Sequence, residues 1–451
     1  MSSNNKFRFR YYENYNHWDE KRFVELLEQN TVKKSKISHL ETLEALKNIG
    51  SPNEKIQSFH IAGTNGKGSV VSFITWALLE TNLKVGTFIS PHLVDYRERF
   101  LINGKLLDGN YVLKEFEQFL EYKFKNLTKF ELMTAFAFYL FEKQKVDINV
   151  IETGMGGRLD ATRVCNPIKT IITGISYDHT DYLGTSLEEI AYEKLHIGRE
   201  NVEMIFNSRN ENVRIVAKNF CRQRKIPLKF VDYSHKIVKH NLKHLSVEYF
   251  LEERNIELTT SMPGIYNIEN LITSYFAISD FVNQNSIKKG FEKAFIPIRM
   301  QIENVNDKLI IIDAAHNHAG INSFVETVKN ILNDNNKKIG LIFNFKYNKD
   351  YGKMAATLKE LFELKKLEFI CIPDFSKGLE EEKISQISKE FKSSQKFNNT
   401  KLLRFENISS AFKFLIADKN IEEIYITGSI YMIGDLFAEM LDKKITWNEQ
   451  D

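Results

Sequence analysis

The segment at residues 63–69, Gly-Thr-Asn-Gly-Lys-Gly-Ser, has the residue types of a phosphate-binding loop. Glycines let a backbone wrap closely around a phosphate, and the N–H groups that open a following helix attract the anion. Lys67 supplies an ammonium for the β- and γ-phosphate oxygens, and Ser69 supplies a hydroxyl for Mg²⁺. We therefore expect ATP to bind here. The expected nucleotide contacts are Gly63, Thr64, Asn65, Gly66, Lys67, Gly68 and Ser69.

The segment departs from the common phosphate-loop pattern GxxxxGK[ST] at two positions. The pattern aligns on Gly66 and Lys67. Ile61 then replaces the first glycine, and Gly68 stands where serine or threonine is usual. A glycine-rich turn that merely opens a helix is therefore an alternative interpretation. The loop alone leaves the chemistry open.

Polar side chains at three other predicted strand ends could hold Mg²⁺ beside ATP. Ser90, Glu152 and His179 each follow a different apolar run rich in β-branched residues. Imidazole is an unusual ligand for so hard a cation, which prefers oxygen. Taken singly, each has a structural alternative: a turn cap, an ion-pair partner and a hydrogen-bonded histidine. Their shared placement after separate strands favours a metal site that also includes Ser69.

Four further residues lie where they could join this chemistry. Lys194 is on a predicted helix, where a solvent-facing lysine is the alternative. Asp313 and His316 end a strand before another helix, and Asp313 could simply cap that helix. Arg299 lies in a predicted linker, either as a phosphate clamp between domains or as an ordinary surface arginine.

These residues need a scaffold that brings separate strand ends together. Up to about residue 230, short apolar runs alternate with helix-length amphipathic segments. This alternation is typical of βαβ units in a mostly parallel sheet, whose ligand binds at the carboxyl ends of the strands. We predict strands at 58–63, 84–90, 148–153 and 169–176. We predict helical segments at 18–49, 67–81, 130–142 and 186–198.

The pattern then changes. Residues 236–262 alternate apolar and polar side chains, as hairpin strands do, and a helical pattern follows at 267–282 before Pro297. Beyond it, strands are predicted at 309–315, 338–345, 367–373 and 422–429. We therefore predict an α/β fold of two domains. Residues 1–296 form a P-loop-type domain with a mostly parallel sheet, and residues 299–451 a smaller Rossmann-like α/β domain.

Composition limits the class of protein. The 451 residues include 62 Lys and Arg against 59 Asp and Glu, a formal net charge of +3 that gives no support for a nucleic-acid partner. The three cysteines (Cys165, Cys221 and Cys371) form no CxxC pair, which favours a reducing compartment. We find neither a signal peptide nor a membrane-spanning segment. We expect a cytoplasmic protein without a membrane partner.

Eight motifs occur in the order typical of one enzyme family. They are HIAGTNGKGS, ISPHLVDYRERF, FELMTAFAFYLF, ETGMGGRLDAT, SYDHTDYLG, EKLHIG, DAAHN and ITGSIYMIGD. From about residue 18 to 440 the chain resembles the folylpolyglutamate synthase and dihydrofolate synthase family, a branch of the Mur ligases. The ordered set is far more specific than any one motif.

The resemblance implies ATP-dependent amide formation. In this family ATP phosphorylates a carboxylate of the pterin substrate, and the amine of L-glutamate attacks the acyl phosphate, releasing ADP and phosphate. The implied partners are a reduced folate or dihydropteroate and L-glutamate, with two Mg²⁺ ions beside ATP, and a monomer is favoured. Because two anions must approach each other, Mg²⁺ and Lys67 are needed to screen their charge.

The resemblance also implies roles for particular residues. Lys194 matches a lysine that the family carries as a carbamate, which turns a cation into an anion near the metal. Direct chemical roles are implied for Lys67, Lys194 and His316. Further nucleotide contacts are Asn270, Arg299 and Asp313. The metal ligands are Ser69, Ser90, Glu152 and His179. The pterin contacts are Thr128, Leu159, Asp160 and Ala161.

The chain departs from the family pattern at three places. Ile298 stands where glycine usually precedes Arg299. Leu195 and His196 replace the usual Ala-Gly pair after the carbamate lysine. Arg163 stands where asparagine is usual, next to the pterin region. These departures touch the linker, the lysine pocket and the substrate loop.

Three functions stay open at the level of the sequence. The first is a folate ligase that adds glutamate, with or without the ability to make dihydrofolate from dihydropteroate. The second is another Mur-type ligase that acts on a peptidoglycan precursor or an amino-acid polymer. The third is a nucleotide-dependent module that performs no ligation, which would leave the DAAHN region unexplained.

Overall fold

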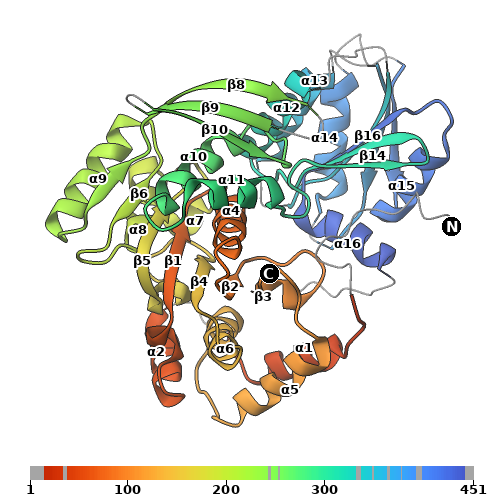
Figure 1. Ribbon diagram of the computed structural model, residues 1–451. Coiled ribbons are helices and arrows are strands. Elements are labelled where there is room, and N and C mark those ends of the chain that lie inside the picture. The colour runs from red at the N-terminus through yellow and green to blue at the C-terminus, as the bar shows by residue number, and fades with distance from the viewer. Residues whose placement is uncertain are drawn as a thin grey trace.

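The computed structural model describes residues 15–33, 38–241, 245–251, 254–331, 337–347, 350–362, 366–376, 378–392 and 399–441. Within these ranges the strands form a seven-stranded, a three-stranded and a six-stranded sheet. We call the α/β part around the seven-stranded sheet the first unit and the part around the six-stranded sheet the second unit. Figure 1 shows the second unit in blue beside the first, with the small sheet arching along the top.

The seven-stranded sheet of the first unit has the order β3-β2-β4-β1-β5-β6-β7. Neighbouring strands are parallel except for β2 and β3, which are antiparallel. Because β1 lies between β4 and β5, the carboxyl ends of these three strands meet at one edge. The strands are β1 Gln57–Ala62, β2 Val85–Phe88, β3 Phe100–Ile102, β4 Ile148–Glu152, β5 Asn166–Ile172, β6 Met204–Phe206 and β7 Leu228–Phe230.

The helix that follows β1 is buried on nearly all sides. This helix, α4 (Lys67–Leu79), packs between the sheet and two later helices, α10 (Asn267–Ile278) and α11 (Gln284–Lys293). A helix that is apolar all round belongs in a core, which explains why this one lacks a polar face. The other helical segments of this unit are α1 Glu20–Gln29, α2 His39–Asn48, α3 Pro52–Lys55, η2 Tyr96–Arg99, α5 Gly109–Leu120, α6 Lys129–Lys143, η3 Ala161–Val164, α7 Thr180–Leu183, α8 Leu187–Leu195 and α9 Glu211–Gln223.

The small sheet is antiparallel, with the order β10-β9-β8. Its strands are β8 (Ser234–His240), β9 (Leu245–Leu251) and β10 (Arg254–Thr260). The alternation of apolar and polar residues predicted hairpin strands here, and the antiparallel pairing confirms that prediction.

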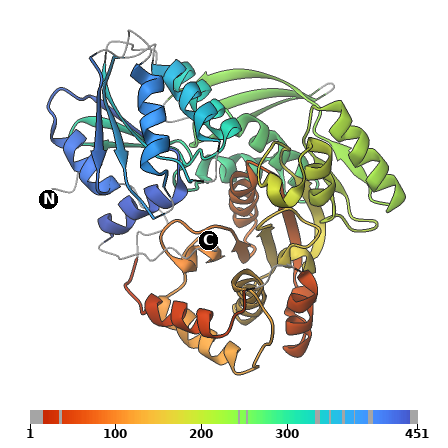
Figure 2. The ribbon, with the colours of Figure 1, turned by 180° about the vertical axis from the view of Figure 1, so that it is seen from behind.

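The second unit repeats the α/β plan in a sheet of order β11-β12-β16-β13-β14-β15. Its strands are parallel except for β11 against β12. Figure 2 shows its helices packed against the sheet from behind. The strands are β11 Gln301–Val305, β12 Lys308–Ile312, β13 Lys338–Phe343, β14 Lys366–Pro373, β15 Lys401–Phe405 and β16 Glu423–Thr427. The helices are α12 His318–Ile331, α13 Tyr351–Phe362, α14 Glu381–Lys392, α15 Ile408–Ala417 and α16 Ile430–Met440.

The predicted α/β class and mostly parallel first sheet are confirmed. Every strand predicted in either unit coincides with an observed strand. The pattern analysis missed β3, β6, β7, β11 and β15, each of which has five residues or fewer. All five lie at or next to a sheet edge, where few residues are needed to complete the sheet.

The two units touch through the segment that joins α11 to β11. The hydroxyl of Ser72 on α4 donates to the carbonyl oxygen of Phe295 at 2.9 Å. Leu93 and Val94 of the first unit pack with Ile298 into an apolar cluster of the second. The predicted linker residue Pro297 lies in this segment. Among the described residues, no helix has the length and apolar character needed to cross a bilayer.

Candidate functional site

The loop from Gly63 to Gly66 joins β1 to α4 and requires glycine at both ends. Gly63 has a φ of 155° and Gly66 a φ of 84°, both in the region that favours glycine. A Cβ on Gly63 would lie 1.9 Å from the Thr173 hydroxyl oxygen, and one on Gly66 2.3 Å from Asn270 Oδ1. Gly66 is the N-cap of α4 and has no side chain to cap it, so the N–H groups of the first turn of α4 can receive an anion.

Residues after β5 brace this loop from the neighbouring strand. The N–H of Thr64 donates to the carbonyl oxygen of Gly174 at 2.8 Å, and the Thr173 hydroxyl donates to the carbonyl oxygen of Asn65 at 2.6 Å. Ser176 accepts from both loop side chains, through its carbonyl oxygen from Thr64 and through its hydroxyl from Asn65. The loop is therefore held in shape by the protein itself.

Lys67 and Glu152 bring opposite charges to the loop. Lys67 Nζ donates to the carbonyl oxygen of Gly63 at 3.2 Å and lies 4.0 Å from Glu152 Oε1. Burial raises the pKa of Glu152 to about 7, although Lys67 and a hydrogen bond from the Ser90 backbone both lower it. A buried carboxylate that retains its proton near neutral pH gains strongly from a cation that displaces the proton.

Of the other predicted metal ligands, Ser69 and Ser90 lie near this carboxylate, whereas His179 lies on the loop before α7. Ser69 is buried in the first turn of α4, next to Gly68, where an added Cβ would lie 3.8 Å from Glu152 Oε2. Ser90 follows β2 and hydrogen-bonds Glu152 through its backbone. His179 is half exposed at the start of α7, and its N–H donates to the side chain of the preceding residue at 2.9 Å.

No three His, Cys, Asp or Glu side chains gather into a metal cage within the part of the chain that the structure describes. Mg²⁺ usually keeps several waters and binds through one or two carboxylates together with substrate phosphates. Glu152 beside the phosphate loop fits an ion of that kind, because the phosphates would complete its coordination. A site of this type is finished by the nucleotide.

Lys194 lies inside the site. Its Nζ donates to the carbonyl oxygen of Gly63 at 3.0 Å from the last turn of α8, and the residue is buried. Burial, and then the charge of Lys67, lower the pKa of Lys194 to about 7. The alternative of a solvent-facing lysine is wrong. A buried amine that is partly neutral can attack CO₂, which a protonated lysine cannot.

Asp313 of the second unit directly follows β12, and both oxygens of its carboxylate accept hydrogen bonds. It accepts from the hydroxyl of Tyr266 at 2.8 Å and from the backbone N–H groups of Met300 and Ala315, each at 2.9 Å. Burial raises the pKa of Asp313, while Arg299 lowers it. These bonds make Asp313 an organiser of the linker and of the loop after β12.

Arg299 lies between the charges of the two units. Its guanidinium lowers the pKa of both Glu152 and Asp313, against the larger effect of burial on each. Asn270, on α10, reaches the phosphate loop at Gly66. Each predicted nucleotide contact outside the loop is thus close to the loop or to the charged groups that surround it.

His316 and Asn317 lie in the loop after Asp313, and Asn317 reaches the first unit. His316 Nδ1 lies 2.8 Å from the carbonyl oxygen of Ala314, so this nitrogen carries the proton in that bond. Asn317 Nδ2 donates to Asn65 Oδ1 at 3.0 Å and to Asp178 Oδ2 at 3.2 Å. The second unit therefore contacts the phosphate loop directly.

The residues predicted to bind a pterin have mixed placements. Thr128 caps α6 and exchanges two hydrogen bonds with Glu131, the fourth residue of the capping box. Asp160 is buried and accepts from two backbone N–H groups and a threonine hydroxyl of its own loop. Ala161 is fully buried, whereas Leu159 is 39% exposed. Thr128 and Asp160 hold their own loops in shape, and Leu159 is the exposed residue of this set.

The loops that carry these residues contact α6 and the end of α8. A Cβ on Gly154 would lie 2.5 Å from the ring of Phe130, so the start of α6 contacts the glycine run after β4. Arg163, one of the departures, donates Nε to the carbonyl oxygen of His196, another departure, at 3.1 Å. Arg199 hydrogen-bonds the carbonyl oxygen of Arg163. The departures in the lysine pocket and the substrate loop are therefore coupled.

The third departure lies in the linker. Ile298 has a φ of 55° and Met300 a φ of 48°. Arg299 is therefore flanked by two left-handed residues, neither of which is glycine. This conformation is a strained one for a β-branched side chain. The carbonyl oxygen of Ile298 accepts from the N–H of Ala314 at 2.8 Å, and its N–H donates to Gln301 Oε1 at 3.1 Å. These two bonds hold Ile298 in a conformation that glycine would adopt without strain.

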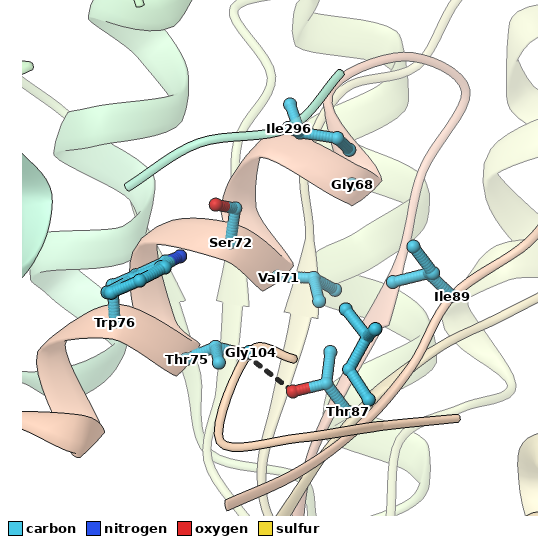
Figure 3. A pocket seen from close by; sticks show the side chains of 10 residues that line it. Gly68, Val71, Ser72, Thr75, Trp76, Thr87, Ile89, Gly104 and Ile296 are labelled. Carbon is cyan, nitrogen blue, oxygen red and sulfur yellow. Dashed lines mark hydrogen bonds between the residues drawn. The ribbon is translucent and has the colours of Figure 1, made fainter. Parts of the chain in front are cut away.

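A narrow crevice lies behind the phosphate-loop helix. Figure 3 shows Ile296 of the linker above Gly68, with Trp76 on one side and the hydrogen-bonded pair Thr75 and Thr87 below. Its lining has no charged side chain, so it offers nothing to a phosphate or a metal. We interpret it as the place where the linker packs against α4.

Lys194 was predicted as a site residue, but four other residues that hold the loop or its partner Asn317 in place were not. Thr173, Ser176 and Asp178 follow β5, and Asn317 follows β12. The signal was available, because polar residues directly after a strand that neighbours β1 must lie near the loop. The weakness of the signal was that serine, threonine and asparagine are common in any loop.

Comparison with known proteins agrees with this geometry. The Mur ligase middle domain family matches residues 61–278. A dihydrofolate synthase/folylpolyglutamate synthase of Bacillus subtilis is 30% identical over 408 residues, which cover 86% of this chain and 91% of the relative.

Solved structures of similar proteins have the same fold. A folylpolyglutamate synthase of Thermotoga maritima is 24% identical with a TM-score of 0.80, covering 95% of this chain and 99% of its own. A bifunctional folylpolyglutamate synthase/dihydrofolate synthase with Mn, AMPPNP and L-glutamate bound is 23% identical with a TM-score of 0.76, covering 93% and 98%. At this identity the likeness establishes the fold.

Proposed function

The chain belongs to the dihydrofolate synthase and folylpolyglutamate synthase family, and from this we propose that it is an ATP-dependent ligase that adds L-glutamate to folates. The observation that carries the proposal is the arrangement of Lys67, Glu152 and Lys194 around Gly63 and its loop. An ammonium group, a buried carboxylate suited to a metal ion and a second, buried lysine at one anion site suit the transfer of a phosphoryl group to an anionic acceptor.

The reaction needs two displacements. A carboxylate oxygen of the pterin substrate attacks the γ-phosphorus of ATP, the bond from that phosphorus to the bridging oxygen breaks, and ADP leaves. The amine of L-glutamate then attacks the acyl carbon, the bond from this carbon to the phosphate oxygen breaks, and phosphate leaves while the nitrogen loses a proton. The protein's part is to hold the anions together and to exclude water.

The residues of the first unit divide this work. Lys67 and the N–H groups at the start of α4 grip the phosphates. We propose Ser69, Ser90, Glu152 and His179 as the ligands of Mg²⁺. When bound, Mg²⁺ supplies positive charge that neutralises the phosphates during transfer.

The proposal for Lys194 is that it carries a carbamate. Its burial and lowered pKa favour the neutral amine that reacts with CO₂, and its Nζ already lies within hydrogen-bonding distance of the phosphate loop. A carbamate there would replace a second ammonium beside Lys67 by an anion, which removes a repulsion and adds a group able to orient a second Mg²⁺.

Asn270 on α10, the linker and the second unit supply the remaining groups. We propose that Asn270, Arg299 and Asp313 contact or frame the nucleotide, and that His316 acts near the incoming glutamate. Both units are needed because the acyl phosphate must be shielded from water while the amine arrives. We place the pterin at Thr128 and residues 159–161, where Leu159 is exposed.

We further propose a cytoplasmic monomer. Every group assigned above comes from one chain, and the three cysteines are buried and free, as suits a reducing compartment. Light scattering of the purified protein across its working concentrations tests the monomer, and a mass of two chains would reject it.

ADP release tests the proposed function. The purified protein is given ATP and Mg²⁺ with tetrahydrofolate, dihydropteroate and L-glutamate, each singly and in combination. We expect release that requires a pterin and L-glutamate together, and the pterin that supports it separates glutamate addition from dihydrofolate synthesis. Release that is indifferent to the pterin would point to a nucleotide-dependent module and reject a folate ligase.

A further inference from the structure

Asn317 joins the second unit to two loops of the first. It lies between β12 and α12, and its Nδ2 donates to Asn65 Oδ1 at 3.0 Å and to Asp178 Oδ2 at 3.2 Å. Asn65 belongs to the phosphate loop, and Asp178 directly precedes His179, a proposed metal ligand. One amide group thus connects the nucleotide-binding loop, the proposed metal loop and the far unit.

The orientation of this amide is set within the second unit. Asn317 Oδ1 accepts from the N–H of Gly320 at 2.8 Å, which caps the start of α12. Because the oxygen is committed to that bond, the NH₂ group must point toward the first unit. The side chain has both of its functions in use, and the residue is buried with 7% exposure.

Each acceptor of this amide is itself held in place. The Asn65 side chain donates its Nδ2 to the hydroxyl of Ser176 at 3.3 Å, and the other oxygen of Asp178 accepts from the N–H of His179 at 2.9 Å. Because both acceptors are anchored in the first unit, a shift of the second unit would strain or break both bonds together. The loop geometry therefore depends on where the second unit sits.

We propose that Asn317 is a positioning residue that couples the placement of the second unit to the phosphate loop and to the loop of His179. It acts through Asn65 and Asp178, without contact to the reacting atoms. The inference rests on the proposed ligase function, in which the second unit must be in place before the acyl phosphate forms. Its consequence is that ATP is held in a reactive geometry only when the units are joined.

The substitution that tests this is Asn317→Asp. Aspartate has the same shape and still accepts from Gly320, so α12 keeps its cap. It has no NH₂ group, and its second oxygen would face Asn65 Oδ1 and the carboxylate of Asp178. Asn317→Ser is a second variant that can keep a cap but is too short to reach the first unit.

Asn407→Asp is the matched control. Asn407 caps α15 in the same unit by accepting from the N–H of Ser410 at 2.8 Å, and its side chain is exposed. The same change of amide to carboxylate at a helix start therefore occurs without contact to the first unit. The melting temperatures of the two aspartate variants should be similar.

We expect Asn317→Asp to lower kcat/KM for ATP by about tenfold or more, because two hydrogen bonds are lost and a like charge is placed beside Asp178. Asn317→Ser should show a smaller loss in the same direction, and Asn407→Asp should stay within about twofold of wild type. Binding of a non-hydrolysable ATP analogue, measured by calorimetry, should weaken in the same order.

A double-mutant cycle with Asp178→Asn makes the test specific. In the double variant the new amide at 178 can donate to the new carboxylate at 317, so the link returns with its direction reversed. We expect the double variant to be several-fold more active than the product of the two single effects. Simple multiplication of the effects, or an Asn317→Asp variant within twofold of wild type, would overturn the coupling.

The two proposals fail in different ways. If wild-type protein releases ADP without need of a pterin, the ligase function fails, and analogue binding still reports whether Asn317 acts on the phosphate loop. If wild type ligates glutamate and Asn317→Asp does so equally well, the ligase function stands and the role of Asn317 is rejected.

Discussion

The phosphate loop and the linker around Arg299 represent opposite ways of building one site. The loop, at residues 63–66, is held mostly within the first unit, by residues that follow β5 and by Lys194 of α8, and Asn317 of the second unit adds one side-chain bond. The linker instead crosses between the units and places Arg299 between two strained residues. The comparison teaches that the nucleotide loop is shaped mostly inside one unit, whereas ligation depends on how the second unit is attached.

Hydrogen bonds of Ile298 and Met300, the residues on either side of Arg299, hold the linker in its strained conformation. Ile298 and Met300 are left-handed, and their backbone groups bond Ala314, Gln301 and Asp313 of the second unit. Left-handed conformations in residues other than glycine cost about 1–2 kcal/mol each. Such strain persists only where the surroundings over-determine it, and it is concentrated at functional sites.

The largest expected effect comes from the phosphate loop and the lysine that follows it. Lys67→Ala removes the ammonium that bonds the Gly63 carbonyl and lies 4.0 Å from Glu152. We expect turnover to fall by about 10³-fold, the upper range for loss of one preorganised charge stabiliser. Steady-state ADP release measures this, and near-normal turnover would mean that the site lies elsewhere. Circular dichroism should be unchanged.

Glu152→Gln tests the metal within the same region. The amide keeps the shape of the side chain but cannot offer a full negative charge to Mg²⁺. We expect an activity loss of about 10²-fold and a rise in the Mg²⁺ concentration needed for half-maximal rate. Titration of activity with Mg²⁺ measures both. An unchanged Mg²⁺ requirement would remove Glu152 from the metal site.

The lowered pKa of Lys194 gives a pH prediction. With a pKa of about 7, the amine is mostly neutral at pH 8 and mostly protonated at pH 6. Because only the neutral form takes up CO₂, the carbamate should form at pH 8 and fall by roughly tenfold at pH 6. Carbon NMR with labelled bicarbonate detects it, with Lys194→Ala as the control. A signal that is equal at both pH values, or shared by the control, would reject the carbamate.

The smallest expected effect is in the linker, and it sharpens the contrast directly. Ile298→Gly and Ile298→Ala both remove the buried side chain, but only glycine relieves the left-handed strain. We expect the glycine variant to be more stable than the alanine variant by about 1 kcal/mol, the reverse of the usual order. Chemical unfolding measures the difference. If alanine were the more stable, the linker would be unstrained.

Much of this architecture could be predicted from sequence, because the signals were local. A β-branched run followed by glycines and a helix pattern fixed β1, the phosphate loop and α4. The polar residues at the ends of β4 and β5 followed from the same logic. The short strands β3, β6 and β7 were missed because three residues carry too little periodicity.

The cross-unit features lay beyond sequence reasoning for a physical reason. The bond from Asn317 to Asn65 spans 252 positions, and no local pattern reports such a distance. The burial of Lys194 likewise depends on the packing of α8 against the loop, and the resemblance alone singled this lysine out. The left-handed Ile298 could be suspected only from the glycine that it replaces.

One isotope experiment tests the central claim, that ATP is used to activate a carboxylate. Tetrahydrofolate labelled with ¹⁸O in its γ-carboxylate is incubated with the protein, ATP, Mg²⁺ and L-glutamate, and the released phosphate is analysed by mass spectrometry. Attack of the carboxylate on the γ-phosphorus predicts that one labelled oxygen per turnover appears in the phosphate. ADP release with unlabelled phosphate would show that water, and not the folate, accepts the phosphoryl group, and would contradict this account.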